Sequence, residues 1–128
     1  RTQLAPNGVG VIDYLNPKDN LLASAFAAAN TLVVPSFYEY PCMVAMEALL
    51  AGTKVAITNG GTTEETFKQY ANYFNPHSES DMHNAIQRTY QNPLPEDAIE
   101  YARNTFLWDN VGRQLETAYK NAGFIPSS

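Results

Sequence analysis

Two glutamates separated by seven residues, Glu39 and Glu47, are the side chains of this sequence best placed to bind a ligand. Glu47 lies inside the apolar segment 41–51, where an unpaired carboxylate is costly to bury. Carboxylates accept hydrogen bonds from sugar hydroxyls, and the N–H groups at a helix start bind phosphate. The pair could therefore hold two ends of an elongated, hydroxyl-rich ligand. The alternative is a helix-start acid and an edge acid placed by the helix dipole alone.

A glycine pair, Gly60-Gly61, follows the apolar run 54–58 and precedes two threonines. Adjacent glycines let the backbone approach a ligand closely, and a plain tight turn explains them equally well. In open parallel sheets, ligands bind beyond the carboxyl ends of the strands, where a loop leads into a helix. We expect the loops 35–42 and 59–63 to lie at that edge.

Short apolar runs alternate with helical patterns through the first part of the chain, which predicts a parallel sheet covered on both faces. The expected strands are 8–15, 31–34, 54–58 and 73–74, and the helices between them are centred on 21–29, 41–51 and 64–69. After Pro76 the pattern becomes helical, beginning with a capping box at 78–81. We therefore expect an α/β fold in one domain, 1–128, with the sheet at about 8–76 and helices at about 78–122 that wrap it.

Composition excludes several classes of function. The chain has 128 residues, of which 45% are apolar, and a net charge of −5, the wrong sign for attraction to nucleic acid or anionic lipid. One cysteine excludes an internal disulfide, and two histidines argue against a transition-metal cage. With no apolar run of bilayer length and no signal segment, we expect a cytoplasmic protein, associated at most peripherally with the inner face of the membrane. Arg1 in place of Met suggests a processed or excised chain.

Several motifs recur in a fixed order: Val33-Val34-Pro35-Ser36-x-x-Glu39, seven residues to Glu47, then Ala51-Gly52 and Gly60-Gly61-x-x-Glu64. This pattern resembles the retaining glycosyltransferases built from two Rossmann domains (the GT-B fold), and within them the family 4-like enzymes, the "glycosyl transferases group 1". The likeness runs from about Val9 to Tyr119. It implies a partial, Rossmann-like C-terminal domain that binds a nucleotide-diphosphate sugar, the donor from which these enzymes transfer a sugar.

The resemblance implies a role for each matching residue. Glu47 would accept hydrogen bonds from the ribose, and Glu39, the candidate catalytic residue, from the transferred sugar. The backbone around Pro41, Cys42 and Met43 would meet the sugar and the diphosphate. Both carboxylates would position the donor rather than exchange protons, and the leaving diphosphate would be stabilised electrostatically.

Gly60 and Gly61 would line the far wall of the same pocket. No metal or other cofactor is implied, since the sequence contains no Asp-x-Asp triplet. The implied partners are the nucleotide-diphosphate sugar and an N-terminal domain that binds the acceptor, a carbohydrate or a lipid-linked sugar.

The sequence departs from the family in two places. Tyr40-Pro41-Cys42 stands where the family has a glycine-containing stretch, so donor binding is expected to be altered. The two upstream strand–helix units, which bring an Arg and a Lys to the diphosphate, have no counterpart before Val9. We therefore expect this chain alone to be catalytically inert. A non-catalytic module that binds a partner protein is the alternative, and a receiver-like signalling domain is a third, although Asp13 stands without the usual acidic cluster.

The resemblance also makes structural predictions. Either the strand at 9–14 pairs directly with that at 32–34, or further strands belong between them. Glu47 should open onto solvent in a crevice within reach of Gly60-Gly61. The remaining candidates, Cys42 as a nucleophile and His77 and His83 as ligands, are expected to pack or lie at the surface, and a last group of aromatic residues should pack: Tyr101, Phe106, Trp108 and Tyr119.

Overall fold

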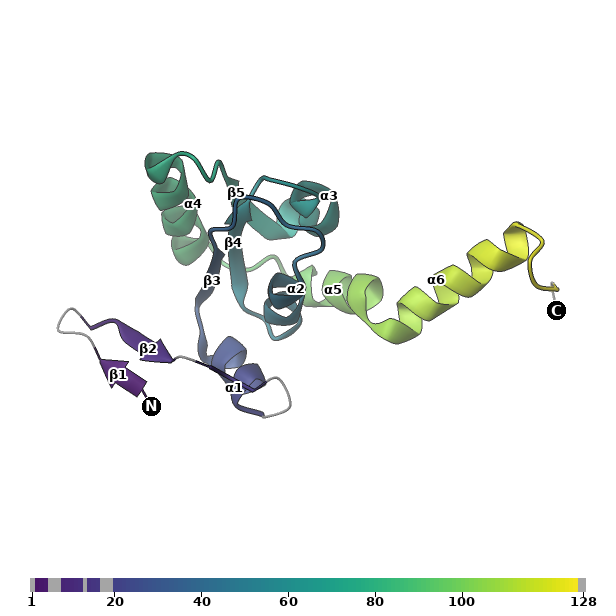
Figure 1. Cartoon of the computed structure of the whole chain (residues 1–128), viewed down its shortest axis with the longest axis horizontal. Coiled ribbons are helices and arrows are strands. Elements are labelled where there is room, and N and C mark those ends of the chain that lie inside the picture. The colour runs from purple at the N-terminus through teal and green to yellow at the C-terminus, as the bar shows by residue number, and fades with distance from the viewer. Residues whose placement is uncertain (1, 5–7, 13, 17–19, 127–128) are drawn as a thin grey trace.

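A parallel sheet of three strands, β3, β4 and β5, lies at the centre of the molecule (Figure 1). The computed structural model describes residues 2–4, 8–12, 14–16 and 20–126. β3 (Thr31–Val34) and β5 (Ala71–Phe74) flank β4 (Lys54–Thr58), with Val34 opposite Ile57 and Ile57 opposite Tyr73. The last four residues of β4 are buried, as expected for a strand covered on both faces. The predicted parallel α/β fold is therefore confirmed.

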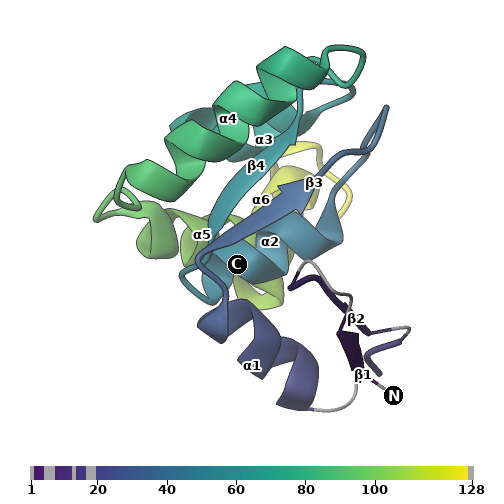
Figure 2. The same cartoon turned by 90° about the vertical axis from the view of Figure 1, so that its left-hand side faces the viewer.

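Helices cover both faces of this sheet. On one face α2 packs against β3 and β4, and α5 packs behind α2, whereas α4 lies across all three strands on the other face (Figure 2). The bounds of the helical elements are α1 Asn20–Ala28, α2 Met43–Leu50, α3 Thr63–Phe67, the 3-10 turn η1 Lys68–Tyr70, α4 Glu79–Gln91, α5 Ala98–Phe106 and α6 Trp108–Asn121.

The main core lies between α2 and the sheet. Leu49 and Ile57 are fully buried there together with Phe67 from α3. Ala45 and Ala48, both fully buried, give α2 small side chains where it meets its neighbours, so the helix can approach them closely. This close packing fixes the axis of α2, and with it the direction in which the remaining side chains of the helix point.

The strand expected at 8–15 is not part of this sheet. Its central residues form β2 (Gly10–Ile12), which pairs antiparallel with β1 (Thr2–Leu4) in a separate two-stranded sheet. Of the two alternatives, direct pairing with β3 is therefore wrong, and further strands between the two stay a prediction. A partner close in sequence satisfies the backbone of β2 at a lower cost in loop entropy than β3 would. All three residues of β2 are exposed, and Asp13 and Pro17, which the sequence placed in this strand and in a helix start, lie outside the described residues.

The C-terminal helices agree only in part with expectation. The capping box is confirmed, since Ser78 Oγ accepts a hydrogen bond from the Asp81 N–H at 3.3 Å. However, α6 extends away from the sheet instead of wrapping it (Figure 1), because Leu107 adopts an extended backbone that separates α6 from α5. Trp108 is therefore 81% exposed and Tyr119 is also exposed, although both were expected to pack, whereas Tyr101 and Phe106 pack against the core. Among the helices described, none has the length and apolar character needed to cross a membrane.

The core predicts the effect of a truncation in α2. Replacing Leu49 by alanine should lower the free energy of unfolding by about 2–5 kcal/mol, because the fully buried side chain leaves a cavity against β4. The matched control is Leu115→Ala on α6, where the side chain is 51% exposed and the loss should be much smaller. Denaturant titration of the three proteins measures both effects, and equal losses would show that α2 does not carry the core.

Candidate functional site

The loops that follow β3 and β4 are joined by backbone hydrogen bonds. The Glu39 N–H donates to the Gly60 carbonyl at 3.3 Å, and the Thr62 N–H donates to the Glu39 carbonyl at 3.2 Å. Glu39 and Gly61 thereby form an isolated parallel bridge beyond the carboxyl end of the sheet. The structure thus brings together, at the predicted edge, the two loops that the sequence singled out.

The glycine pair is required by this contact. A Cβ on Gly60 would lie 2.3 Å from the Phe37 carbonyl oxygen, and a Cβ on Gly61 would lie 2.1 Å from the Glu39 carbonyl oxygen. Gly61 also has a φ of +89°, which side-chain-bearing residues rarely adopt. The sequence offered a ligand contact or a tight turn as reasons for the pair, and the structure adds a third, the close approach of another loop.

Two buried threonines hold the glycine loop in shape. Thr58 Oγ1 accepts a hydrogen bond from the Gly60 N–H at 3.0 Å, and the Thr63 hydroxyl donates to the Thr58 carbonyl at 2.7 Å. Both side chains are fully buried. The turn between β4 and α3 is therefore tied to the end of β4 by groups that water does not reach.

The two glutamates lie on either side of the start of α2. Glu39 is half-buried at the bridge, and Glu47 is exposed, because the buried face of α2 is formed by Ala45, Ala48 and Leu49. Within the described residues Glu47 makes no ion pair. This exposure removes the cost of burying its carboxylate.

The start of α2 lies four residues beyond the Glu39 bridge. Cys42 precedes the helix with no capping hydrogen bond from its side chain, and the Met46 N–H donates to the Cys42 carbonyl at 3.2 Å. The N–H groups that come before Met46 in the first turn therefore have no carbonyl partner within the helix, as at any helix N-terminus. Pro41 and Met43, on either side of Cys42, are exposed.

The Cys42 side chain packs beneath Glu39. It is 3% exposed, and burial raises the pKa of its thiol to about 11. The Ala45 N–H lowers this pKa, whereas the charge of the Glu39 carboxylate and the hydrogen bond that it accepts from the thiol raise it. The thiol is thus neutral at physiological pH, which agrees with the packing role expected for Cys42 and not with a nucleophile.

Two hollows open near the start of α2. One, of about 250 Å³, is mainly apolar and extends from Pro41 and Met46 to the N-terminal end of α6. The other, of about 530 Å³, includes Lys68, whose Nζ lies 5.4 Å from the centre of the Tyr101 ring. Neither is lined by Glu39 or Glu47, so the crevice expected beside Glu47 stays a prediction. The lining of the larger hollow is Tyr40, Pro41, Thr62, Glu65, Thr66, Lys68, Tyr101, Thr105 and Phe106.

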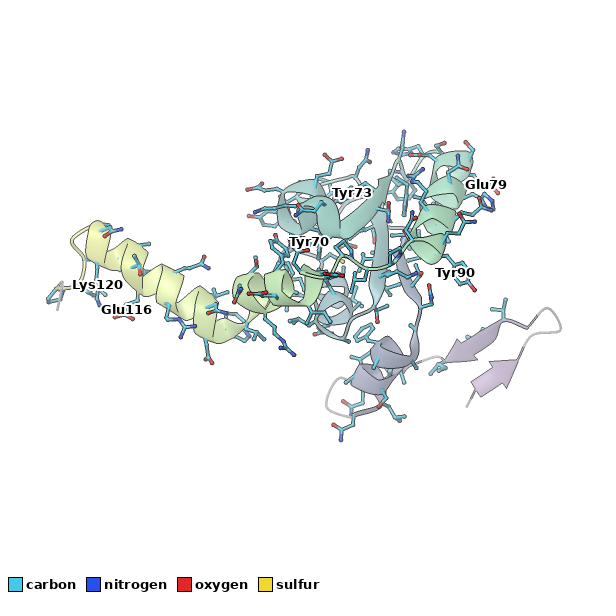
Figure 3. The ribbon with its side chains drawn as sticks, turned by 180° about the vertical axis from the view of Figure 1, so that it is seen from behind. Tyr70, Tyr73, Glu79, Tyr90, Glu116 and Lys120 are labelled. Atoms are coloured by element: carbon cyan, nitrogen blue, oxygen red, sulfur yellow. The ribbon has the colours of Figure 1, made fainter. Side chains whose placement is uncertain are left out.

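Sequence reasoning missed Lys68 as a neighbour of this edge. It treated all basic residues as scattered, and several of those described are indeed engaged elsewhere. Lys54 Nζ donates to the carbonyls of Tyr90 and Asn92 at the end of α4, and Lys120 pairs with Glu116 at 2.8 Å on α6 (Figure 3). Arg1 and Lys18 lie outside the described residues. The sequence contains no motif that points to Lys68. It belongs to the turn η1, and only the folded chain brings it to the same hollow as Tyr40 and Pro41.

The other ionisable side chains serve the fold. The Tyr70 hydroxyl donates to Asp97 at 2.7 Å, which raises the pKa of Tyr70, and burial raises the pKa of Tyr73, whose hydroxyl donates to the Lys68 carbonyl (Figure 3). His77 and His83 are exposed, as expected. In the described parts of the chain, no three His, Cys, Asp or Glu side chains gather in a way that could hold a metal ion.

Comparison with known proteins decides the family. The model of the family described as "Glycosyl transferases group 1" matches residues 3–105, most of the chain. The chain belongs to the glycosyl transferases group 1 family. This confirms the resemblance drawn from the acid–seven–acid motif and removes the receiver-like signalling domain as an alternative.

Individual members of the family are similar over most of this chain. It is 31% identical over 119 residues to the "D-inositol 3-phosphate glycosyltransferase" of Corynebacterium glutamicum, and 25% identical over 141 residues to the "MMP alpha-(1->4)-mannosyltransferase" of Mycolicibacterium hassiacum. These matches cover 87% and 94% of this chain but only 28% and 34% of the relatives. The chain thus spans about a third or less of the curated relatives that it matches.

A solved structure in the family has the same fold. Sucrose-phosphate synthase from Thermosynechococcus elongatus superposes with a TM-score of 0.67 at 29% identity, over 80% of this chain and 27% of that one. The arrangement seen here, a parallel sheet followed by C-terminal helices, is that of the C-terminal, donor-binding domain of GT-B glycosyltransferases.

The buried Cys42 thiol should make the stability of this chain fall at alkaline pH. Its pKa of about 11 in the folded chain lies above the ordinary value of 9.0, so the unfolded chain loses the thiol proton first as the pH rises. The stabilising contribution is therefore complete below pH 9.0 and is lost as the pH approaches about 11.

The Cys42→Ser variant, which does not titrate in this range, isolates the effect. Denaturant titrations from neutral pH to about pH 11 should show wild type losing stability relative to Cys42→Ser. The tyrosines titrate alike in both proteins and cancel. A difference that stays constant with pH would contradict the assignment of a buried, neutral thiol.

Proposed function

We propose that this chain forms part of the donor site of a retaining glycosyltransferase that transfers a sugar from a nucleotide-diphosphate sugar to a carbohydrate or lipid-linked acceptor. The observation that carries the proposal is the Glu39–Gly61 bridge, which holds the acid–seven–acid motif and the glycine loop together beyond the carboxyl ends of β3 and β4. Ligands of open α/β sheets bind at such an edge. Family membership and the donor-binding fold support the same proposal.

Each site residue has a proposed role. Glu47, exposed on α2, accepts hydrogen bonds from the ribose hydroxyls, and Glu39 accepts them from the transferred sugar. The start of α2, from Pro41 through Cys42 to Met43, faces the sugar and the diphosphate with backbone N–H groups, where the helix dipole favours negative charge. Proline supplies no N–H, so Cys42 and Met43 are the first donors there.

The glycine loop, Gly60-Gly61, forms the opposite wall of the proposed site. Chemistry in this arrangement is positioning and electrostatic stabilisation. The bond between the sugar and the diphosphate breaks as the acceptor oxygen bonds to the sugar from the same face, and the departing diphosphate oxygen takes the proton of the acceptor hydroxyl. No protein nucleophile is proposed, since the Cys42 thiol is buried and neutral. We propose further that no metal or other cofactor takes part, and that the enzyme works in the cytoplasm, associated at most peripherally with the inner face of the membrane.

The groups that neutralise the diphosphate and bind the acceptor are proposed to lie in other parts of a longer protein. The relatives are about three times as long as this chain or longer. The two hollows described near the start of α2 contain one basic side chain, that of Lys68, to meet the charge of a diphosphate. A non-catalytic module that binds a partner protein is the second candidate, favoured by Tyr40, which is 74% exposed beside Pro41, where the family has a glycine-containing stretch.

The two candidates predict different binding. In the full-length protein, Glu47→Gln should weaken binding of a nucleoside diphosphate roughly 10- to 100-fold, the worth of hydrogen bonds to a charged acceptor. Glu39→Gln should leave nucleoside diphosphate binding unchanged and weaken binding of the matching nucleotide sugar. Calorimetric titration with UDP, GDP, ADP and their glucose or mannose conjugates measures both.

Glu79→Gln, an exposed acid on α4 across the sheet from α2, is the matched control and should behave as wild type. If no member of this panel binds, or if binding is indifferent to Glu47→Gln, the donor site is refuted and the partner-binding module is favoured.

The isolated chain, residues 1–128, should transfer no sugar from any donor in this panel. The physical reason is the lack of charge to stabilise the leaving diphosphate. Release of nucleoside diphosphate in the presence of oligosaccharide acceptors is the measurement, with the full-length protein as positive control. Turnover by the isolated chain would show that the described residues already contain a complete active site.

A further inference from the structure

The Glu39 carboxylate can act on the transferred sugar only if its backbone is held in one place. We propose that Thr58, Gly60 and Gly61 are positioning residues for Glu39: they fix its backbone from the neighbouring loop, and thereby fix where its carboxylate meets the sugar. The contact between the Glu39 carboxylate and the sugar rests on the proposed function, whereas the positioning of the Glu39 backbone is a property of this fold.

The first step is the anchoring of the glycine loop to β4. Thr58 is the last residue of β4, is fully buried, and accepts the Gly60 N–H on its hydroxyl at 3.0 Å. The same residue accepts the Thr63 hydroxyl on its carbonyl. A buried acceptor for a backbone N–H cannot be replaced by water without rearrangement, so the turn keeps one conformation.

The second step is the transfer of that constraint to Glu39. Gly60 offers its carbonyl to the Glu39 N–H, while Thr62 offers its N–H to the Glu39 carbonyl. Both backbone groups of Glu39 are therefore bonded to the glycine loop. These two bonds, and no others from the segment 35–41, join the β3 loop to the β4 loop by backbone hydrogen bonds in the described structure.

The third step is the distance between the loops. The positions of a Cβ at 60 and at 61 are occupied by the carbonyl oxygens of Phe37 and Glu39, at 2.3 and 2.1 Å. Any side chain at either position would push the β3 loop away. The carboxylate of Glu39 would then move relative to Glu47, whose place is set independently by the packing of α2.

The variants are chosen to loosen Glu39. Thr58 lies outside the walls proposed for the site, whereas Gly60 belongs to one of them. Thr58→Val keeps the buried shape but removes the acceptor of the Gly60 N–H, and Thr58→Ser restores that acceptor. Gly60→Ala introduces the Cβ that collides with the β3 loop. Gly112→Ala, on α6 with no atom within 4 Å of the added Cβ, is the matched glycine control.

Binding to the full-length protein gives the first readout. Thr58→Val should weaken binding of the nucleotide sugar about fivefold, a loss equivalent to one hydrogen bond, while binding of the nucleoside diphosphate through Glu47 is unchanged. Gly60→Ala should weaken binding of the nucleotide sugar by more. Thr58→Ser and Gly112→Ala should match wild type. A merely structural role would weaken both ligands equally, and such a result, or no change in Thr58→Val and Gly60→Ala, would overturn the proposal.

Labelling of Cys42, the single cysteine of the chain, gives a second readout that needs no ligand. The thiol is buried near Glu39, so a displaced β3 loop should make it react faster with a thiol reagent in Thr58→Val and Gly60→Ala than in Ile86→Ala, which loses packing in the separate cluster under α4. Rates that only follow the loss of global stability would overturn the positioning role. If wild type binds no nucleotide sugar, the proposed function fails, and the labelling alone decides whether these residues position Glu39.

Discussion

The structure depends on a contact between two loops. The backbone of the loop after β3 occupies the space that side chains at positions 60 and 61 would need, and both positions are glycine. The carbonyls of Phe37 and Glu39 lie where a Cβ on Gly60 or Gly61 would be. Since Glu39 also exchanges hydrogen bonds with Gly60 and Thr62, its place is set by the end of the neighbouring strand. α2 begins only four residues beyond the bridge, so the start of this helix follows from the same constraint.

The sheet and α2 supply the rest of the site. The register of β3 on β4, with Val34 opposite Ile57, brings both loops to one edge. The alanines of α2 pack inward, which turns Glu47 to solvent on the opposite side of the helix. One carboxylate is thus positioned by a loop contact and the other by helix packing. A ligand that reaches both must span the start of α2, as an elongated nucleotide sugar would.

Much of this could be predicted because the signals are local. The buried runs at 31–34 and 54–58 and the cap at Ser78 each carry their own pattern of apolar or capping residues, and the acid–seven–acid spacing identified the family. The remainder depends on tertiary partners. The apolar run that contains β2 predicts a strand but not its partner β1, which is only three residues long. The apolar stripe of α6 likewise predicts a helix but not its position relative to the sheet. The need for Gly61 arises from Glu39, more than twenty positions away, and Lys68 and Tyr40, which line one hollow, are also more than twenty positions apart.

A crystal structure of the full-length protein with the nucleotide sugar that it binds most tightly would test the donor site most directly. We expect the transferred sugar to lie within hydrogen-bond distance of Glu39 and the ribose within that distance of Glu47, with the diphosphate against the start of α2. A nucleotide sugar seated elsewhere, for example in the hollow beside Lys68 and Tyr101 with neither carboxylate in reach, would contradict it.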